Sequence, residues 1–408
     1  MMRSATLLSI IFAAPLCGDQ INITEYAVPT PQSWPSDITQ GPDGALWFTE
    51  FQGNKIGRMT IAGQFTEYPL PNPLPAGVPW GITVGPDRAL WFTEDHGNNI
   101  GRITTGGRIT EYPIPTLNSS PRRIVAGPDG ALWFTEYAGN KIGRITTAGE
   151  ISERPLPRRR TQPAGLTVGP DGALWFTENS GNAIGRMTTT GQVAEYLVPT
   201  PNEVGGQIVS GPDGALWFTE NYGNKIGRIT TAGVMTEYPV PTINSIPDGM
   251  TAGPDGALWF TEWTGNKLGR ITTAGLITEY NLPTPLSFPW SITVGPDGAL
   301  WFTEYRNDKI GRSPVCGLGL GASVSNGILK LNFALGITTP AIWTTIIQQD
   351  SGSAQQLWSF PIPATFPPIS QTVAVPFLSI GPATITSDLS DKTTGTHLCT
   401  EVRNVGGF

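Results

Sequence analysis

The sequence predicts an all-β protein, in which a seven-bladed β-propeller is followed by a small β-sandwich. A ten-residue segment, GPDGALWFTE, first occurs at 41–50, and a variant at 85–94 differs only at Arg88. The tryptophans of the seven copies recur with one interval of 44 residues and five of 42, which is the length of a four-stranded propeller blade. After Arg312 the repeat ends and the composition changes. The remaining copies lie at 127–136, 169–178, 211–220, 253–262 and 295–304.

Each repeat contains four short segments with the character of β-strands. In 289–312, WSITV forms the first strand and GPDG a turn with proline at its second position and glycine where a positive φ is needed. ALWFTE alternates as a second strand, and KIGR begins a third after a tight hairpin turn. The fourth strand corresponds to the ITEY segment, as at 276–280.

The order of the segments predicts how the ring closes. Seven ITEY-like segments occur, but the first precedes blade 1 and none follows blade 7. We therefore expect residues 22–26 to supply the outer strand of blade 7, within a propeller that spans 21–313. Closure of this kind removes the exposed sheet edges of an open ring. The tryptophans are expected to pack between neighbouring blades.

The C-terminal segment, 314–408, has a different pattern. It carries few charges and six short apolar or alternating segments, which indicate a small β-sandwich. In an oxidising compartment Cys316 and Cys399 are expected to form a disulfide, with two free thiols as the alternative. The six segments are 327–335, 341–349, 355–363, 371–377, 382–389 and 397–405.

The N-terminus and the charge indicate an exported protein. Residues 1–20 combine a basic start with an apolar run from Ala5 to Leu16, which is typical of a secretion signal, and lipid attachment at Cys17 is the alternative. We expect a secreted or periplasmic monomer. The formal net charge of −7 argues against nucleic acid as a partner. No later apolar stretch is long enough to span a membrane.

The repeated motifs GPDGALWFTE, GNKIGRIT and ITEYPLP closely resemble those of the virginiamycin B lyases, also called streptogramin lyases, over 21–313. The resemblance implies a seven-bladed propeller that linearises cyclic depsipeptides by elimination at an ester, with Mg²⁺ and a histidine base. In that family the histidine follows a proline at the start of a blade's first strand. One metal-binding glutamate lies just before this Pro-His pair, and another ends a WFTE strand.

This sequence departs from the family pattern at the catalytic positions. No blade has histidine at the family's position, and no blade has glutamate two residues before it. Of the metal ligands only the WFTE glutamates remain, so Glu262 and Glu304 are the candidates, and Mg²⁺ is expected only under the lyase hypothesis. The family's histidine position is occupied in turn by Ser36, Trp80, Arg122, Ala164, Gly206, Asp248 and Trp290.

The seven WFTE glutamates repeat without variation. Each precedes the arginine of the GR pair by eight residues, as Glu50 precedes Arg58. We expect a structural role, either a cross-strand ion pair or bonding to the backbone. A catalytic site would break the sevenfold symmetry, which this feature keeps.

The variable positions indicate where a ligand would bind, because the blades differ mainly in two loops. These loops precede the first strand and follow WFTE, and we expect them on one face as a ligand-binding rim for a small molecule, glycan or peptide. The alternative is that the rings only cover neighbouring loops. His96 beside Asp95 could form a general base, with a solvated loop histidine as the alternative. The expected rim comprises Trp34, Trp80, Arg122, Tyr137, Asp248, Trp263, Trp290 and Tyr305.

The sequence therefore favours a lyase-like propeller that acts as a binding module, without a cofactor. The alternative is an enzyme with a rearranged site, either a Mg²⁺-dependent lyase that breaks a C–O bond or a hydrolase.

Overall fold

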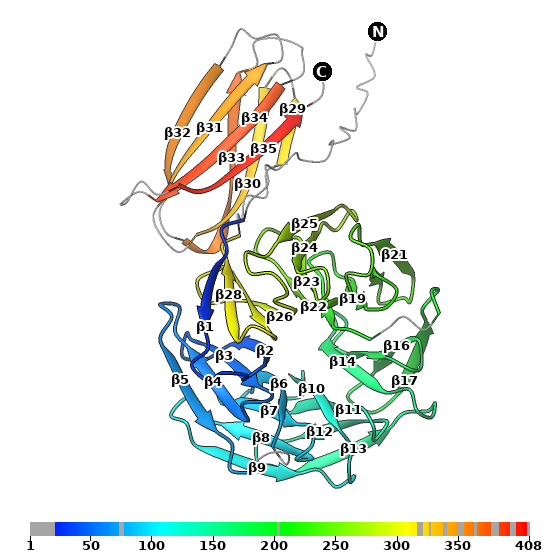
Figure 1. Cartoon of the computed structure of the whole chain (residues 1–408). Coiled ribbons are helices and arrows are strands. Elements are labelled where there is room, and N and C mark those ends of the chain that lie inside the picture. The colour runs from blue at the N-terminus through cyan, green and yellow to red at the C-terminus, as the bar shows by residue number, and fades with distance from the viewer. Residues whose placement is uncertain are drawn as a thin grey trace. The chain divides into compact units, whose positions relative to one another are not determined.

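In a computed structural model of the chain, the structure describes residues 21–72, 77–201 and 205–315, together with the backbone of seven strands beyond residue 320. Residues 21–313 form one compact unit, and the segment from Pro314 onward belongs to another. Within 21–313, seven four-stranded antiparallel sheets are arranged around an axis as the blades of a propeller (Figure 1). The predicted seven-bladed fold is confirmed.

Each blade consists of an inner, a second, a third and an outer strand. The innermost strands are β2 (Pro35–Gln40), β6 (Pro79–Val84), β10 (Pro121–Ala126), β14 (Pro163–Val168), β18 (Ile208–Ser210), β22 (Pro247–Ala252) and β26 (Pro289–Val294). The second strands are β3 (Leu46–Glu50), β7 (Leu90–Glu94), β11 (Leu132–Glu136), β15 (Leu174–Glu178), β19 (Leu216–Glu220), β23 (Leu258–Glu262) and β27 (Leu300–Glu304). The third strands are β4 (Lys55–Met59), β8 (Asn99–Ile103), β12 (Lys141–Ile145), β16 (Ala183–Met187), β20 (Lys225–Ile229), β24 (Lys267–Ile271) and β28 (Lys309–Ser313). The outer strands are β5 (Phe65–Pro69), β9 (Ile109–Pro113), β13 (Ile151–Pro155), β17 (Val193–Leu197), β21 (Met235–Pro239), β25 (Ile277–Asn281) and β1 (Thr24–Ala27).

Blade 7 is completed by the N-terminal strand, as the sequence predicts. Strand β1 pairs antiparallel with β28, with Thr24 opposite Arg312 (Figure 1). The carboxylate of Glu25 accepts a hydrogen bond of 2.6 Å from Lys309 Nζ, and Tyr26 stacks on Trp301. The first strand of the propeller is therefore its last strand in space.

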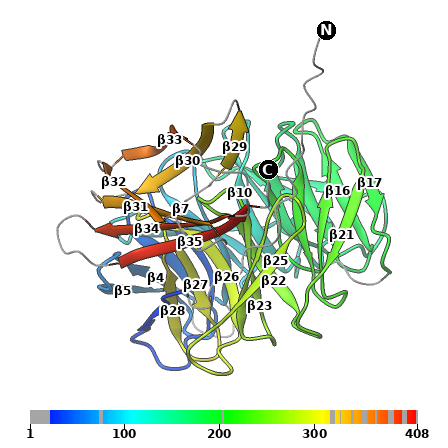
Figure 2. The same cartoon turned by 90° about the horizontal axis from the view of Figure 1, so that it is seen from above.

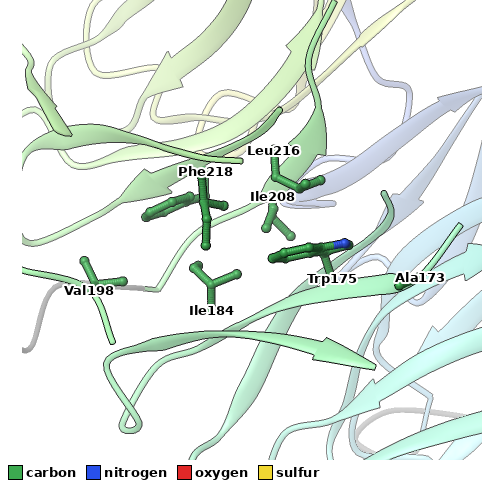
Figure 3. Close-up of a cluster of buried hydrophobic side chains, with 8 residues drawn as sticks. Ala173, Trp175, Ile184, Val198, Ile208, Leu216 and Phe218 are labelled. Atoms are coloured by element: carbon green, nitrogen blue, oxygen red, sulfur yellow. The ribbon is translucent and has the colours of Figure 1, made fainter. Parts of the chain in front are cut away.

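The tryptophans of the repeat fill the gaps between blades, which confirms their predicted position. Trp175 from blade 4 is fully buried against Ile208, Leu216 and Phe218 from blade 5 (Figure 3). Its indole Nε1 donates to Asp171, the aspartate of GPDG, at 3.0 Å. The hydrophobic core of the propeller is therefore a ring of clusters, each shared by two neighbouring blades.

The predicted pairing of the WFTE glutamate with the GR arginine is wrong. Because the hairpin turn occupies 51–54, Glu50 lies opposite Lys55, and Arg58 lies opposite Trp47. Arg58 Nε instead donates to the carboxylate of Asp43 at 2.7 Å. All seven glutamates are fully buried. Among the described residues, the carboxyl oxygens of Glu50 and Glu136 have no hydrogen-bond partner.

A belt of threonines joins each blade to the next. Thr49 Oγ1 donates to the backbone oxygen of Trp80 in blade 2 at 2.8 Å, and accepts from the backbone N of Asp37 in its own blade at 2.9 Å. The WFTE threonines of the other blades repeat both bonds. The last bond, from Thr303 to Ser36 O at 2.9 Å, closes the ring. The belt gives the invariant threonine a structural role.

The C-terminal segment contains seven strands in two antiparallel sheets. One sheet has the order β29-β30-β33, and the other has the order β32-β31-β34-β35, in which β31, β34 and β35 run side by side (Figure 2). The sequence predicts six of these strands and misses β29. The strands are β29 (Gly321–Ser325), β30 (Ile328–Ile337), β31 (Ala341–Gln349), β32 (Gln355–Ile362), β33 (Thr365–Pro376), β34 (Ala383–Asp391) and β35 (His397–Val405).

Two sequence predictions lie outside the described residues. The secretion signal at 1–20 and Cys316 are not among them, and of Cys399 only the backbone, within β35, is described. The signal and the disulfide therefore stay predictions. In the described part of the chain, no helix is long and apolar enough to cross a membrane.

Candidate functional site

The two variable loops of each blade lie together on one face of the propeller. In blade 1 the first residue of β2, Pro35, pairs with the last residue of β3, Glu50. The loop after WFTE is therefore held against the loop before the inner strand, where Phe51 N donates to Trp34 O at 3.1 Å. Trp263 and Ile246 in blade 6 repeat this bond at 3.0 Å. Side chains from both loops of every blade can therefore converge near the axis.

A cavity of about 410 Å³ lies at this face and receives lining residues from all seven blades. Each inner strand contributes at its start, from Asp37 in blade 1 to Trp290 in blade 7. Of the eight predicted rim residues, Trp34 and Tyr305 do not line the cavity. The other six line the cavity: Trp80, Arg122, Tyr137, Asp248, Trp263 and Trp290.

One side of the cavity is formed by an aromatic cluster. Trp263 and Trp290 meet edge to face with centroids 4.5 Å apart, and Trp290 meets Trp80 at 5.6 Å. Trp34 stacks on Phe51, and its ring centroid lies 5.3 Å from that of Tyr305. Some of the predicted rings therefore line the cavity, and the others contact only further rings of the cluster. The aromatic cluster comprises Trp34, Phe51, Trp80, Trp263, Phe288, Trp290 and Tyr305.

Arg122 lines the cavity next to this cluster. Its guanidinium carbon lies 4.0 Å from the ring centroid of Trp80 and 4.8 Å from that of Tyr137. A guanidinium close to two aromatic rings gains cation–π attraction from both. Its nearest carboxylate is Asp95, at 3.8 Å.

The floor of the cavity is a network that the sequence analysis missed. Asp37 forms an ion pair with Arg123, accepts from Ser291 Oγ at 2.7 Å, and accepts from the backbone N of Ile82 at 2.9 Å. The position of Asp37 is variable, with glycine in blades 2, 4 and 6 and polar residues in blades 1, 3, 5 and 7. That alternation could have identified Asp37 and Gln207.

Asp248 in blade 6 lines the cavity and occupies the family's histidine position in the sequence. Its carboxylate accepts a hydrogen bond from Asn221 Nδ2 at 3.1 Å. Desolvation by burial, with the charge of Asp37 as a smaller contribution, raises its pKa to about 7, although the charge of Arg123 opposes the shift. Asp248 can therefore exchange a proton near neutral pH, as a histidine does.

The predicted pair of His96 and Asp95 is not assembled into a base. His96 is exposed in the turn after β7, whereas Asp95 is buried and faces Arg122. Neither residue lines the cavity. Within the described ranges no hydrogen bond or ion pair joins the two.

The glutamates that the lyase hypothesis would assign to Mg²⁺ do not fit the ion. Glu262 and Glu304 are fully buried, and neither lines the cavity. Burial raises the pKa of Glu262 to about 8 and that of Glu304 to about 7. A protonated carboxyl group is a poor metal ligand. Across the part of the chain that the structure describes, no three His, Cys, Asp or Glu side chains are grouped to hold a metal.

The fold and the cavity define the class of the protein, which is a closed seven-bladed propeller with a ligand-sized cavity lined by blade-specific side chains. The chain belongs to the virginiamycin B lyase family, whose sequence profile matches residues 17–208 and 200–319.

Solved structures of related proteins match over the propeller. A selenomethionine-substituted virginiamycin B lyase from Staphylococcus aureus has a TM-score of 0.69 and 44% sequence identity, with 72% of this chain and 99% of that chain covered. A catalytically inactive variant of the Staphylococcus aureus virginiamycin B lyase, with quinupristin, has a TM-score of 0.68, 44% identity and the same coverage.

A curated relative matches over a short segment. The virginiamycin B lyase of Bordetella pertussis is 41% identical over 54 residues, which are 13% of this chain and 18% of that protein. The match therefore covers less than a fifth of the relative's length.

Proposed function

We propose that this protein is an exported binding propeller that takes a small amphipathic molecule, such as a cyclic peptide, in the cavity. The observation that carries the proposal is a cavity surrounded by all seven blades whose lining differs from blade to blade. Its volume of about 410 Å³ is within the range of small-molecule sites. The scaffold repeats almost without change, so the variation at the cavity is not required by folding.

The remaining parts of this proposal come from the sequence. Export to the periplasm or the medium is supported by the apolar N-terminal run, and the two C-terminal sheets suit a β-sandwich. We propose a monomer that binds its ligand without a metal ion or other cofactor. Addition of EDTA then leaves the affinity unchanged.

Isothermal titration calorimetry with two aromatic probes that lack a carboxylate, quinupristin and indole-3-propionamide, tests the binding function. We expect one saturable site per chain. Trp290→Ala, which changes a residue of the cavity lining, should abolish binding. Trp34→Ala, which changes a residue outside the lining, should retain it. The proposal is overturned if neither probe binds saturably up to about 5 mM, since fragments that fill a real site reach roughly millimolar affinity.

A second candidate function is supported by Asp248. This carboxylate lies in the cavity at the family's histidine position, and its pKa of about 7 suits a general base. In an elimination the base removes a proton from the carbon next to the ester-bearing carbon, and the C–O bond of the ester breaks to leave a carboxylate. The ring opens without a change in mass, whereas hydrolysis adds one water.

Incubation with quinupristin, followed by liquid chromatography and mass spectrometry, distinguishes these functions. A new peak of unchanged mass that is lost in Asp248→Asn would establish elimination. A product heavier by one water would establish hydrolysis. Intact quinupristin, with and without Mg²⁺, is the result expected of a binding module.

A further inference from the structure

We infer that Arg122 is an oxyanion subsite of the cavity, and that the ligand carries a carboxylate together with an aromatic group. This inference rests on the proposed binding function and specifies its ligand class.

The guanidinium of Arg122 lacks hydrogen-bond partners within the described residues. Its Cζ lies over the rings of Trp80 and Tyr137, at 4.0 and 4.8 Å from their centroids. In the described part of the chain no hydrogen bond reaches the guanidinium, and its Nε is buried without a partner. The contact of 3.8 Å with Asp95 is too long for a hydrogen bond. The two ring contacts thus restrict the planar donor fork without occupying its N–H groups.

The GR arginines and Arg123 differ from Arg122 in this respect. The GR arginines each donate to an aspartate, as Arg144 does to Asp129 at 2.7 Å. Arg123, the next residue in the chain, is paired with Asp37 in the cavity floor. Two adjacent arginines therefore line one cavity, and only Arg123 has a carboxylate within hydrogen-bond distance. The other blades fold without an arginine at this position, so the scaffold does not require Arg122.

The rest of the cavity defines the other half of the ligand. Trp80 contacts Arg122 with its face and Trp290 edge to face, and Trp290 contacts Trp263 in turn. All four side chains line the same cavity. A planar carboxylate matches the guanidinium fork, and an aromatic ring matches the tryptophan wall. A molecule that carries a carboxylate and an aromatic ring on a short linker can contact Arg122 and the tryptophans at once.

Calorimetry with a matched pair of probes, indole-3-propionate and indole-3-propionamide, tests this inference. The two probes differ in charge and share the ring and linker. We expect the carboxylate to bind wild-type protein about 10- to 100-fold more tightly than the amide, as charge-assisted hydrogen bonds allow. Arg122→Gln should reduce this ratio to about 1 with little change in amide affinity.

Two further variants sharpen the test. Arg306→Gln is the matched control, because Arg306 also lies over an aromatic ring, at 5.0 Å from Trp34, but outside the cavity lining. It should leave the ratio unchanged. Asp95→Asn should raise carboxylate affinity, since it removes the negative charge beside Arg122.

The outcomes separate this inference from the function on which it rests. Equal affinity for the two probes in wild-type protein, or a ratio that persists in Arg122→Gln, would overturn the oxyanion subsite while binding in the cavity stands. If neither probe nor quinupristin binds, the proposed function fails and the subsite fails with it.

Discussion

The two ends of each blade differ in how strictly the sequence is kept. At the end with the GPDG turn, an aspartate accepts from the tryptophan and pairs with the arginine in every blade, as Asp213 does with Trp217 and Arg228. At the other end, blades 2, 3 and 6 present Trp80, Arg122 and Asp248 at one equivalent position. The first end is kept because each bond supports packing between blades. The second end can vary because its side chains face a cavity.

The junction of blade 7 gives the largest expected effect. A chain that begins at Pro29 lacks β1, and with it the pairing to β28, the stack of Tyr26 on Trp301 and the ion pair of Glu25 with Lys309. We expect the melting temperature to fall by roughly 10 °C or more, or aggregation from the open edge. A chain that begins at Ile21 is the control, measured by the same thermal scan. Equal stability of the two would show that closure is dispensable.

Two tryptophans, one from each end, test the comparison directly. Trp217→Ala removes a fully buried ring and should lower the free energy of unfolding by about 3–5 kcal/mol. Trp263→Ala removes a half-buried ring of the cavity wall, so we expect about 1–2 kcal/mol and loss of probe binding. Chemical denaturation and calorimetry measure both. Equal destabilisation would mean that the cavity wall is part of the core.

The buried WFTE glutamates make the scaffold sensitive to pH. Burial, together with the charge of Glu153, raises the pKa of Glu136 to about 8, above its usual value of 4.5. The folded state then binds more protons than the unfolded state between these values, so stability falls as the pH rises from about 4.5 to 8.

Thermal scans at about pH 5 and 8 test this sign. Glu136→Gln should show a smaller difference in melting temperature between the two pH values than wild-type protein. Glu150→Gln, at an exposed position of the same blade, should behave as wild type. A wild-type protein that is more stable at pH 8 contradicts the prediction.

Blade 3 departs from the repeat in its outer strand, β13. Six blades stack a tyrosine on the tryptophan with centroids 5.5–5.7 Å apart, but blade 3 has Arg154 at that position. Restoring the stack in Arg154→Tyr should raise the free energy of unfolding by about 0.5–1.5 kcal/mol. No gain in denaturant midpoint would show that the stack follows from packing rather than contributing to it.

The smallest effect is expected at Arg88. This residue has φ of 60°, where the turns of the other six blades have glycine at 71–75°. Because the left-handed region costs a side-chain-bearing residue more than glycine, Arg88→Gly should stabilise the protein by up to about 1 kcal/mol. A loss of stability would reveal a contact of the arginine side chain that outweighs this cost.

The repeat predicts the scaffold well because each bond of one blade recurs in the others. The period sets the number of blades, and the count of ITEY segments identifies β1 as the closing strand. The error at Glu50 and Arg58 arose because strand register depends on turn length, and a turn at 51–54 places Lys55 opposite the glutamate.

The cavity was predicted only in outline. The sequence placed Trp80 and Tyr137 near one face of the propeller, but it did not predict that both rings contact Arg122, since side-chain directions depend on neighbours in other blades. Asp37 was missed because its partners, Arg123 and Ser291, come from blades 3 and 7.

The pairing of β1 with β28 also places the start and the end of the propeller in adjacent strands, with Thr24 beside Arg312. Of the seven blades, only blade 7 combines strands from both ends of the propeller, so the ring has a single closure point, here called the seam. Circular permutation could move that seam: a short linker from Arg312 to Thr24 and new termini in another hairpin would keep every ladder. Because the two ends of the propeller are adjacent, a longer polypeptide can carry it as an inserted domain whose two connections lie close together.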